Sequence, residues 1–136
     1  MSKPQGELAE TAFLHRATEL ELPVSQPYGD NQRYDFIVDG GRKRWRVQVK
    51  STRQFDPKRK NYQARVGRRV GQGSQRVCYL ESELDFFALY IVPEDTWYII
   101  PFAALNGRMS LSLHSSQHAK PGPMEAYREA WHLLRE

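Results

Sequence analysis

An acid, an amide and a lysine lie close together in residues 34–52, whose sequence reads YDFIVDGGRKRWRVQVKST. Asp35 lies on the first of two β-type runs, and Gln48 and Lys50 lie two residues apart on the second. Because residues two apart on a strand share a face, Gln48 and Lys50 are predicted to point the same way. Carboxylate and amide oxygens suit a hard divalent cation, and a nearby lysine can stabilise negative charge that develops during a reaction. The group therefore favours metal-assisted hydrolysis.

Two predicted strands, residues 33–39 and 44–51, position these side chains, and the glycines between them mark a turn. In the second strand Trp45, Val47 and Val49 alternate with polar residues. A buried face is therefore expected to oppose a face that carries the amide and the lysine. The simpler interpretation is an amphipathic hairpin whose polar face is only solvated.

The length of the hairpin loop decides which residues meet across the two strands. If the loop comprises residues 40–43, Asp35 faces Gln48, and directly opposed residues have Cβ atoms roughly 5 Å apart. If the two glycines alone form a tight turn, Asp35 faces Arg46 instead. The metal-site interpretation therefore requires the longer loop.

A helix is predicted over residues 6–22, ending before Pro23, which cannot continue it. On a helical wheel Glu10 lies about 60° from Phe13, at the edge of the apolar face, and Glu7 lies further into solvent. The apolar stripe of this helix comprises Ala9, Phe13, Ala17 and Leu20.

The remaining elements are mostly strands. The order of elements predicts an α/β (mixed α+β) fold in which an N-terminal and a C-terminal helix flank a central mixed sheet. At 136 residues the chain is expected to form one domain, residues 1–136. The predicted elements are strands at 24–28, 61–66, 85–92 and 96–100, a helical turn at 101–105, an edge strand at 109–113, a loop at 115–123 and a final helix at 124–135.

Positive charge is concentrated in residues 53–76, which carry eight basic residues against Asp56 alone. The whole chain has a net charge of only +4, so this segment, at +7, leaves −3 for the rest. Such a segment attracts a phosphate backbone. Its glycines and Tyr62, which could stack on a base, favour DNA binding over a solvated basic loop. The candidate DNA-binding residues are Arg53, Lys58, Arg59, Lys60, Arg65, Arg68, Arg69 and Arg76.

Composition also indicates where the protein works. No apolar run approaches the roughly 20 residues of a membrane span, so no membrane partner is expected. The first residues, MSKPQGE, have no apolar segment behind their charge, unlike a secretory signal. The single cysteine, Cys78, excludes an internal disulfide. A reducing, cytoplasmic setting is therefore expected.

Three short motifs, GELAE at 6–10, YDFIV at 34–38 and VQVK at 47–50, resemble the PD-(D/E)XK nuclease superfamily. The closest resemblance is to a small group that includes a cyanobacterial group I intron homing endonuclease and has Gln in place of the usual acid, giving a QxK motif. Residues 79–101 are also similar to that group, and the resemblance spans about residues 6–102. It implies a restriction-endonuclease-like core.

The resemblance implies an endonuclease that hydrolyses DNA phosphodiester bonds with Mg²⁺, for which Mn²⁺ can substitute. Glu10, Asp35 and Gln48 would hold the metal, and Lys50 would be the lysine of the motif. A homo-oligomer, dimer or tetramer, is also implied, since a double-strand cut usually needs two active sites. Gln48 departs from the usual acid, and Tyr34 departs from the usual proline before the first acid.

Two rival functions remain open at this stage. The neutral Gln48 favours a catalytically inactive DNA-binding module on the same fold. The basic segment is also compatible with a protein-interaction subunit that binds an acidic partner.

Overall fold

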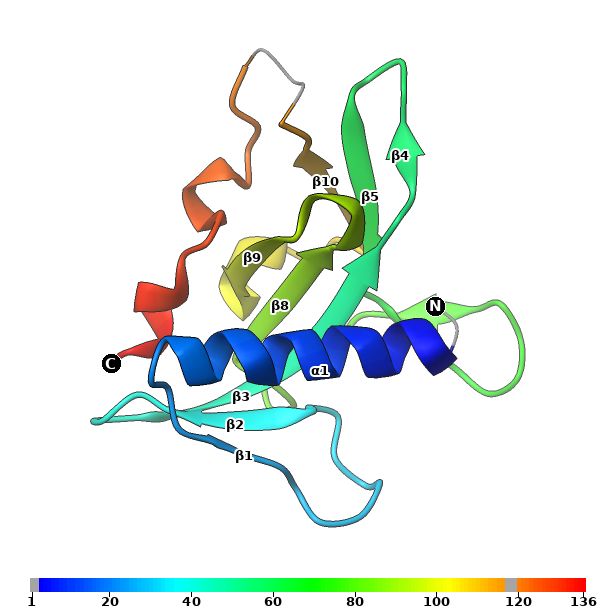
Figure 1. The fold of residues 1–136 in the computed structure, drawn as a ribbon. Helices are drawn as coiled ribbons and strands as arrows, with labels where there is room; N and C mark the ends of the chain where they lie inside the picture. Colours follow the sequence, from blue (N-terminus) through cyan, green and yellow to red (C-terminus); the bar gives the residue numbers. More distant parts are fainter. Residues whose placement is uncertain (1–2, 117–119) are drawn as a thin grey trace.

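The computed structural model describes residues 3–116 and 120–136. A helix, α1 (Lys3–Glu19), lies across one face of a five-stranded sheet (Figure 1). All neighbouring strands of this sheet are antiparallel except β3 and β8, which are parallel. In spatial order the strands are β1 (Val24–Ser25), β2 (Phe36–Asp39), β3 (Arg44–Thr52), β8 (Phe86–Ile91) and β9 (Thr96–Pro101).

The chain between β3 and β8, together with one strand that follows β9, forms a smaller layer, and Figure 1 shows its β4–β5 hairpin projecting beyond the end of β3. A three-stranded antiparallel sheet has the order β10, β5, β4, and a separate two-stranded hairpin follows β5 in the chain. The bounds are β4 (Phe55–Asp56), β5 (Asn61–Arg65), β6 (Arg68–Arg69), β7 (Arg76–Val77) and β10 (Ser110–His114). The predicted edge strand at 109–113 is therefore confirmed as β10, shifted by one residue.

Two apolar clusters hold these layers together. The first lies between α1 and the large sheet, where Phe13 is fully buried. Its ring stacks on Phe36 at 5.2 Å between centroids and meets the edge of Trp97 at 5.7 Å. The second cluster, which includes Phe87 and Tyr62, fills the space on the other side of the sheet. Tyr62 is only 6% exposed, so the expectation that it could stack on a base is wrong.

The helix α1 ends at Glu19, three residues before the predicted end at residue 22. The N–H of Leu22 donates to the carbonyl of Ala17 at 2.9 Å, and the N–H of Glu21 donates to Thr18 at 3.1 Å. Glu21 has a positive φ of 58°, so these bonds form a Schellman motif. The apolar stripe of the helix was predicted correctly. Its C-terminal end was not, because the left-handed residue that caps it is Glu21 and not a glycine.

The predicted C-terminal helix at 124–135 is wrong. Two short 3₁₀ turns, η3 (Glu125–Tyr127) and η4 (Trp131–Leu134), take its place. Between them Glu129 has φ 48°, its N–H donates to the carbonyl of Trp97 at 2.7 Å, and its carboxylate accepts from the Trp97 N–H at 2.8 Å. The segment therefore pairs with the edge of β9 instead of closing its own helical bonds.

Two further 3₁₀ turns lie beside β9. The turns η1 (Val92–Glu94) and η2 (Phe102–Leu105) flank β9, and η2 matches the helical turn predicted at 101–105. Among the described residues, no helix combines the length and the apolar character needed to cross a bilayer.

Candidate active site and basic cleft

The β2–β3 hairpin has the register that the metal-site interpretation requires. Asp39 pairs with Arg44, and the same register extended to Asp35 sets it opposite Gln48. The loop is the longer one, because the Gly40 N–H donates to the carbonyl of Lys43 at 2.8 Å. The alternative pairing of Asp35 with Arg46 is therefore excluded.

The carboxylate of Asp35, which immediately precedes β2, is held against the backbone of β3. It accepts a hydrogen bond from the Val49 N–H at 2.7 Å, while its own N–H donates to the Val47 carbonyl at 2.9 Å. Val47 and Val49 are buried toward α1, and Gln48 and Lys50 are half-buried on the alternate positions. Strand alternation thus separates the apolar and the reactive side chains, as the sequence predicted.

Glu10, Asp35 and Lys50 are electrostatic neighbours. Burial, followed by the negative charges of Asp35 and Glu7, raises the pKa of Glu10. Burial also raises the pKa of Asp35, against the opposing effects of the Val49 hydrogen bond and the charge of Lys50. Two partly desolvated carboxylates that repel each other are stabilised by a cation between them.

Lys50 experiences the opposite influence. Burial lowers the pKa of its ammonium group, the charge of Asp35 opposes this, and the charge of Arg76 adds to it. Its Nζ also lies 5.8 Å from the ring centroid of Tyr79, which is itself only 7% exposed. Sequence reasoning assigned no role to Tyr79, because nothing local to residues 79–85 indicates that they pack beside the end of β3.

The oxygen donors at this point fit a hard divalent cation only with help from Gln48. Within residues 3–116 and 120–136, no three His, Cys, Asp or Glu side chains gather in an arrangement that could hold a metal ion. Glu10 and Asp35 would supply two carboxylates, and Gln48, which lies opposite Asp35 in the hairpin, would have to supply its amide oxygen as a neutral third donor. Such an all-oxygen set suits Mg²⁺ or Mn²⁺ rather than a soft metal.

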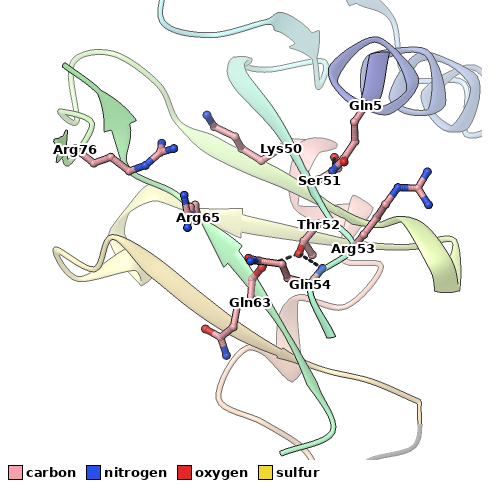
Figure 2. Close-up of a pocket in the computed structure, with 9 residues that line it drawn as sticks. All are labelled: Gln5, Lys50, Ser51, Thr52, Arg53, Gln54, Gln63, Arg65 and Arg76. Carbon is pink, nitrogen blue, oxygen red and sulfur yellow. Dashed lines mark hydrogen bonds between the residues drawn. The ribbon is translucent and has the colours of Figure 1, made fainter. Parts of the chain in front are cut away.

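A cleft of about 350 Å³ opens beside Lys50 (Figure 2). Four separate segments form it: the start of α1, the end of β3 with the residues after it, β5, and β7. The lining residues are Gln5, Lys50, Ser51, Thr52, Arg53, Gln54, Gln63, Arg65 and Arg76. Sequence reasoning found the basic members but missed Gln5, whose Nε2 donates to the Ser51 hydroxyl at 2.9 Å.

The predicted DNA-binding residues do not form one continuous element. Arg53, Arg65 and Arg76 line the cleft, whereas Lys58, Arg59 and Lys60 occupy the exposed turn between β4 and β5. Arg68 and Arg69 lie on β6, where Arg69 is exposed and Arg68 is half-buried with its Nε shielded from solvent.

A family profile and solved structures both match this chain. A family profile described as PD-(D/E)XK endonuclease matches residues 1–134. A solved structure described as a bacterial homing endonuclease, I-Ssp6803I, is similar at 28% sequence identity with a TM-score of 0.84. That alignment covers 98% of this chain and 93% of the other. No curated protein matches the sequence significantly.

Proposed function

Because the chain belongs to the PD-(D/E)XK endonuclease family, we propose that it is a DNA endonuclease that hydrolyses phosphodiester bonds with a divalent metal ion, Mg²⁺ or Mn²⁺. Its ligands would be Glu10, Asp35 and Gln48, with Lys50 as the catalytic lysine. The observation that carries the proposal is the geometry of the β2–β3 hairpin, which sets Asp35 opposite Gln48, holds the Asp35 carboxylate on the Val49 N–H and places Lys50 at a basic cleft.

A divalent ion bound there would polarise the phosphoryl group and lower the pKa of an attacking water. The chain's own groups have separate tasks. Asp35 keeps its orientation through the Val49 N–H. Lys50, whose pKa is lowered by burial, holds a cation close to the reacting phosphate and stabilises charge on its oxygens. The basic residues around the cleft bind the backbone of the substrate strand.

Cleavage of DNA by the wild-type protein beside the Lys50→Ala variant tests this function. The substrates are a supercoiled plasmid, a branched duplex and a pool of random duplexes enriched for binding, each with Mg²⁺ or Mn²⁺. Loss of one charge-stabilising group typically lowers the rate at least a hundredfold, so Lys50→Ala should cut none of them measurably. Arg42→Ala, which removes a cation from the distant β2–β3 loop, is the matched control and should cut normally.

A catalytically inactive DNA-binding protein is the second candidate. It is favoured by the neutral Gln48 and by the presence of only two carboxylates in the proposed ligand set. If the wild-type protein binds the enriched duplexes tightly but leaves all of them intact with both metals, this candidate replaces the nuclease. The enrichment step matters, because an enzyme that requires a particular target sequence would leave most plasmids uncut.

The number of copies in the active species follows from the geometry of a double-strand cut. One ligand set of Glu10, Asp35 and Gln48 per chain provides for one strand, so we propose that two or more copies act together. Sedimentation equilibrium with and without duplex DNA measures this directly. A monomer that makes double-strand breaks in a single binding event contradicts it.

A further inference from the structure

The cleft beside Lys50 is lined by cations and neutral donors. Among its lining residues four are Lys or Arg and none is Asp or Glu. Figure 2 shows Lys50, Arg65 and Arg76 gathered on one side of the cleft, whereas Arg53 extends away from them. Like charges held this close repel one another, and an anion between them removes the repulsion.

The walls of the cleft are held in place by hydrogen bonds that leave its cationic groups available. The Thr52 hydroxyl donates to the Gln63 carbonyl at 2.6 Å and accepts from the Gln54 N–H at 3.1 Å. The Gln63 amide donates to the Ser112 hydroxyl at 2.8 Å, which joins β5 to β10. Because β5 is fixed on both sides, Arg65 projects from a rigid strand.

Among the described residues, the Arg76 side chain forms one hydrogen bond. Its Nη1 donates to the Gly67 carbonyl at 3.3 Å, which ties the β6–β7 hairpin to its own base. A guanidinium group has five N–H donors, so the remaining donors of Arg76 can form a bidentate contact with a phosphate. Arg76 lines the same side of the cleft as Lys50 (Figure 2), and its positive charge lowers the pKa of Lys50.

The turn between β4 and β5 also carries cations, but unlike the cleft it has an acid among them. Asp56 accepts hydrogen bonds from the Lys58 N–H at 2.9 Å and the Arg59 N–H at 3.3 Å, and it lies 3.9 Å from the Arg59 guanidinium. The cations of the turn therefore have an acid among them, and they do not line the cleft beside Lys50. The basic segment contains two unequal groups of cations.

We propose that the cleft is a subsite for a backbone phosphate that neighbours the scissile phosphate on the cut strand, with Arg65 and Arg76 as its ligands. Lys50 lies between the two phosphates, because it lines the cleft and also interacts with Asp35. The position of this subsite beside the scissile phosphate rests on the proposed nuclease function. Its affinity for DNA does not.

The first test measures DNA binding without metal, by fluorescence anisotropy of a labelled 20-bp duplex in chelator over a range of salt concentrations. The double variant Arg65→Ala/Arg76→Ala loses one phosphate contact, so its slope of log K against log salt should be flatter than wild type by about 0.9. The double variant Arg42→Ala/Arg44→Ala loses the same charge at the other end of β3, roughly 20 Å from Lys50. Its slope should equal that of wild type.

Equal flattening by the two double variants would overturn the subsite, because it would indicate only a general electrostatic effect. Since Arg76 also ties down its hairpin, thermal unfolding of both variants is compared. The single variant Arg65→Gln, which removes the charge of an exposed side chain but keeps its first two methylene groups and a polar end, repeats the measurement with minimal effect on folding. A slope unchanged from wild type in Arg65→Gln and in the double cleft variant also refutes the proposal.

The second test locates the subsite along the strand, on a duplex whose cut position has been mapped. A neutral methylphosphonate replaces each phosphate beside the scissile one in turn. At one of these positions the wild-type rate should fall about tenfold, whereas the double cleft variant should change less than twofold, because it has already lost that contact. Equal sensitivity of both proteins at every position would move the subsite elsewhere. If wild type cuts nothing, the proposed nuclease function fails, and the metal-free slopes still decide whether the cleft binds a phosphate.

Discussion

Replacement of Asp35 by Asn should have opposite effects on the protein with and without metal. In the absence of metal, the change removes a buried charge whose pKa is raised by burial, and it relieves the repulsion felt by Glu10. The Asn oxygen can still accept the hydrogen bond from Val49. The metal-free variant should therefore unfold at the same temperature as wild type or higher.

The magnitude with metal follows from linkage. Above the dissociation constant, each tenfold increase in metal concentration stabilises the folded state by about 1.4 kcal/mol per bound ion at 25 °C. With an unfolding entropy of roughly 2.1 cal/mol/K per residue, a chain of this length gains about 5 °C per tenfold increase. Loss of a charged ligand should shift the onset for Asp35→Asn to at least tenfold higher concentration.

Thermal unfolding followed by circular dichroism measures both effects. It is recorded first in chelator and then in MgCl₂ or MnCl₂ at about 0.1–50 mM, on the order of the affinities of exposed carboxylate sites. Asp39→Asn is the matched control, since it lies at the other end of β2 and its Asn oxygen can still accept from the Gly41 N–H. It should respond to metal as wild type does. The reasoning is refuted if wild type shows no metal-dependent rise, or if Asp35→Asn responds at the same concentrations.

Three further predictions concern stability, each measured by urea unfolding. Phe13→Ala should lower the free energy of unfolding by about 3–5 kcal/mol, because it leaves a cavity among the rings that fix α1 on the sheet; a loss under 1 kcal/mol would contradict this. Burial tends to raise the pKa of Asp85, but its hydrogen bonds and ion pair with Arg46 lower it overall, so Asp85→Asn should cost about 1–2 kcal/mol. That difference should be complete above about pH 5 and should vanish as the pH falls through the lowered pKa of the folded state, and a constant difference down to pH 2 would refute it. Gly40→Ala should cost about 1–3 kcal/mol, because the added Cβ overlaps the backbone carbonyl of Leu134, and an unchanged midpoint would show that the C-terminal segment is not packed there.

Local patterns predicted the hairpin and the helix well, because both are encoded in nearby residues. The alternation of apolar and polar residues around Val47 identifies the buried face of the strand, and the apolar stripe through Phe13 identifies that of the helix. Neither pattern requires knowledge of the element that packs against that face. The hairpin loop was ambiguous for a tertiary reason. The Lys43 N–H donates to the carbonyl of Glu136 at 2.9 Å, so a contact from the far end of the chain supports the longer loop.

The C-terminal segment and the cleft could not be predicted in the same way. The spacing of Met124, Trp131 and Leu134 marks buried positions correctly, but it also matches a helical stripe. The bonds of Glu129 to the edge of β9 decide between the two, and they join residues 32 positions apart. The cleft depends on four segments that meet only in the folded protein. The roles of Glu10, Asp35, Gln48 and Lys50 in catalysis stay predictions until cleavage is measured.

The parallel pairing of β3 with β8 makes the whole basic segment a crossover connection between the two central strands of the sheet. Loop closure becomes costlier only slowly with length, by about 0.6 kcal/mol for each doubling. The exposed turns at 57–60 and 70–75 can therefore gain, lose or exchange residues while the strands on either side keep their register. Changes in these turns could therefore alter the proposed DNA-binding surface while the β2–β3 hairpin, which carries the proposed metal ligands Asp35 and Gln48, stays the same.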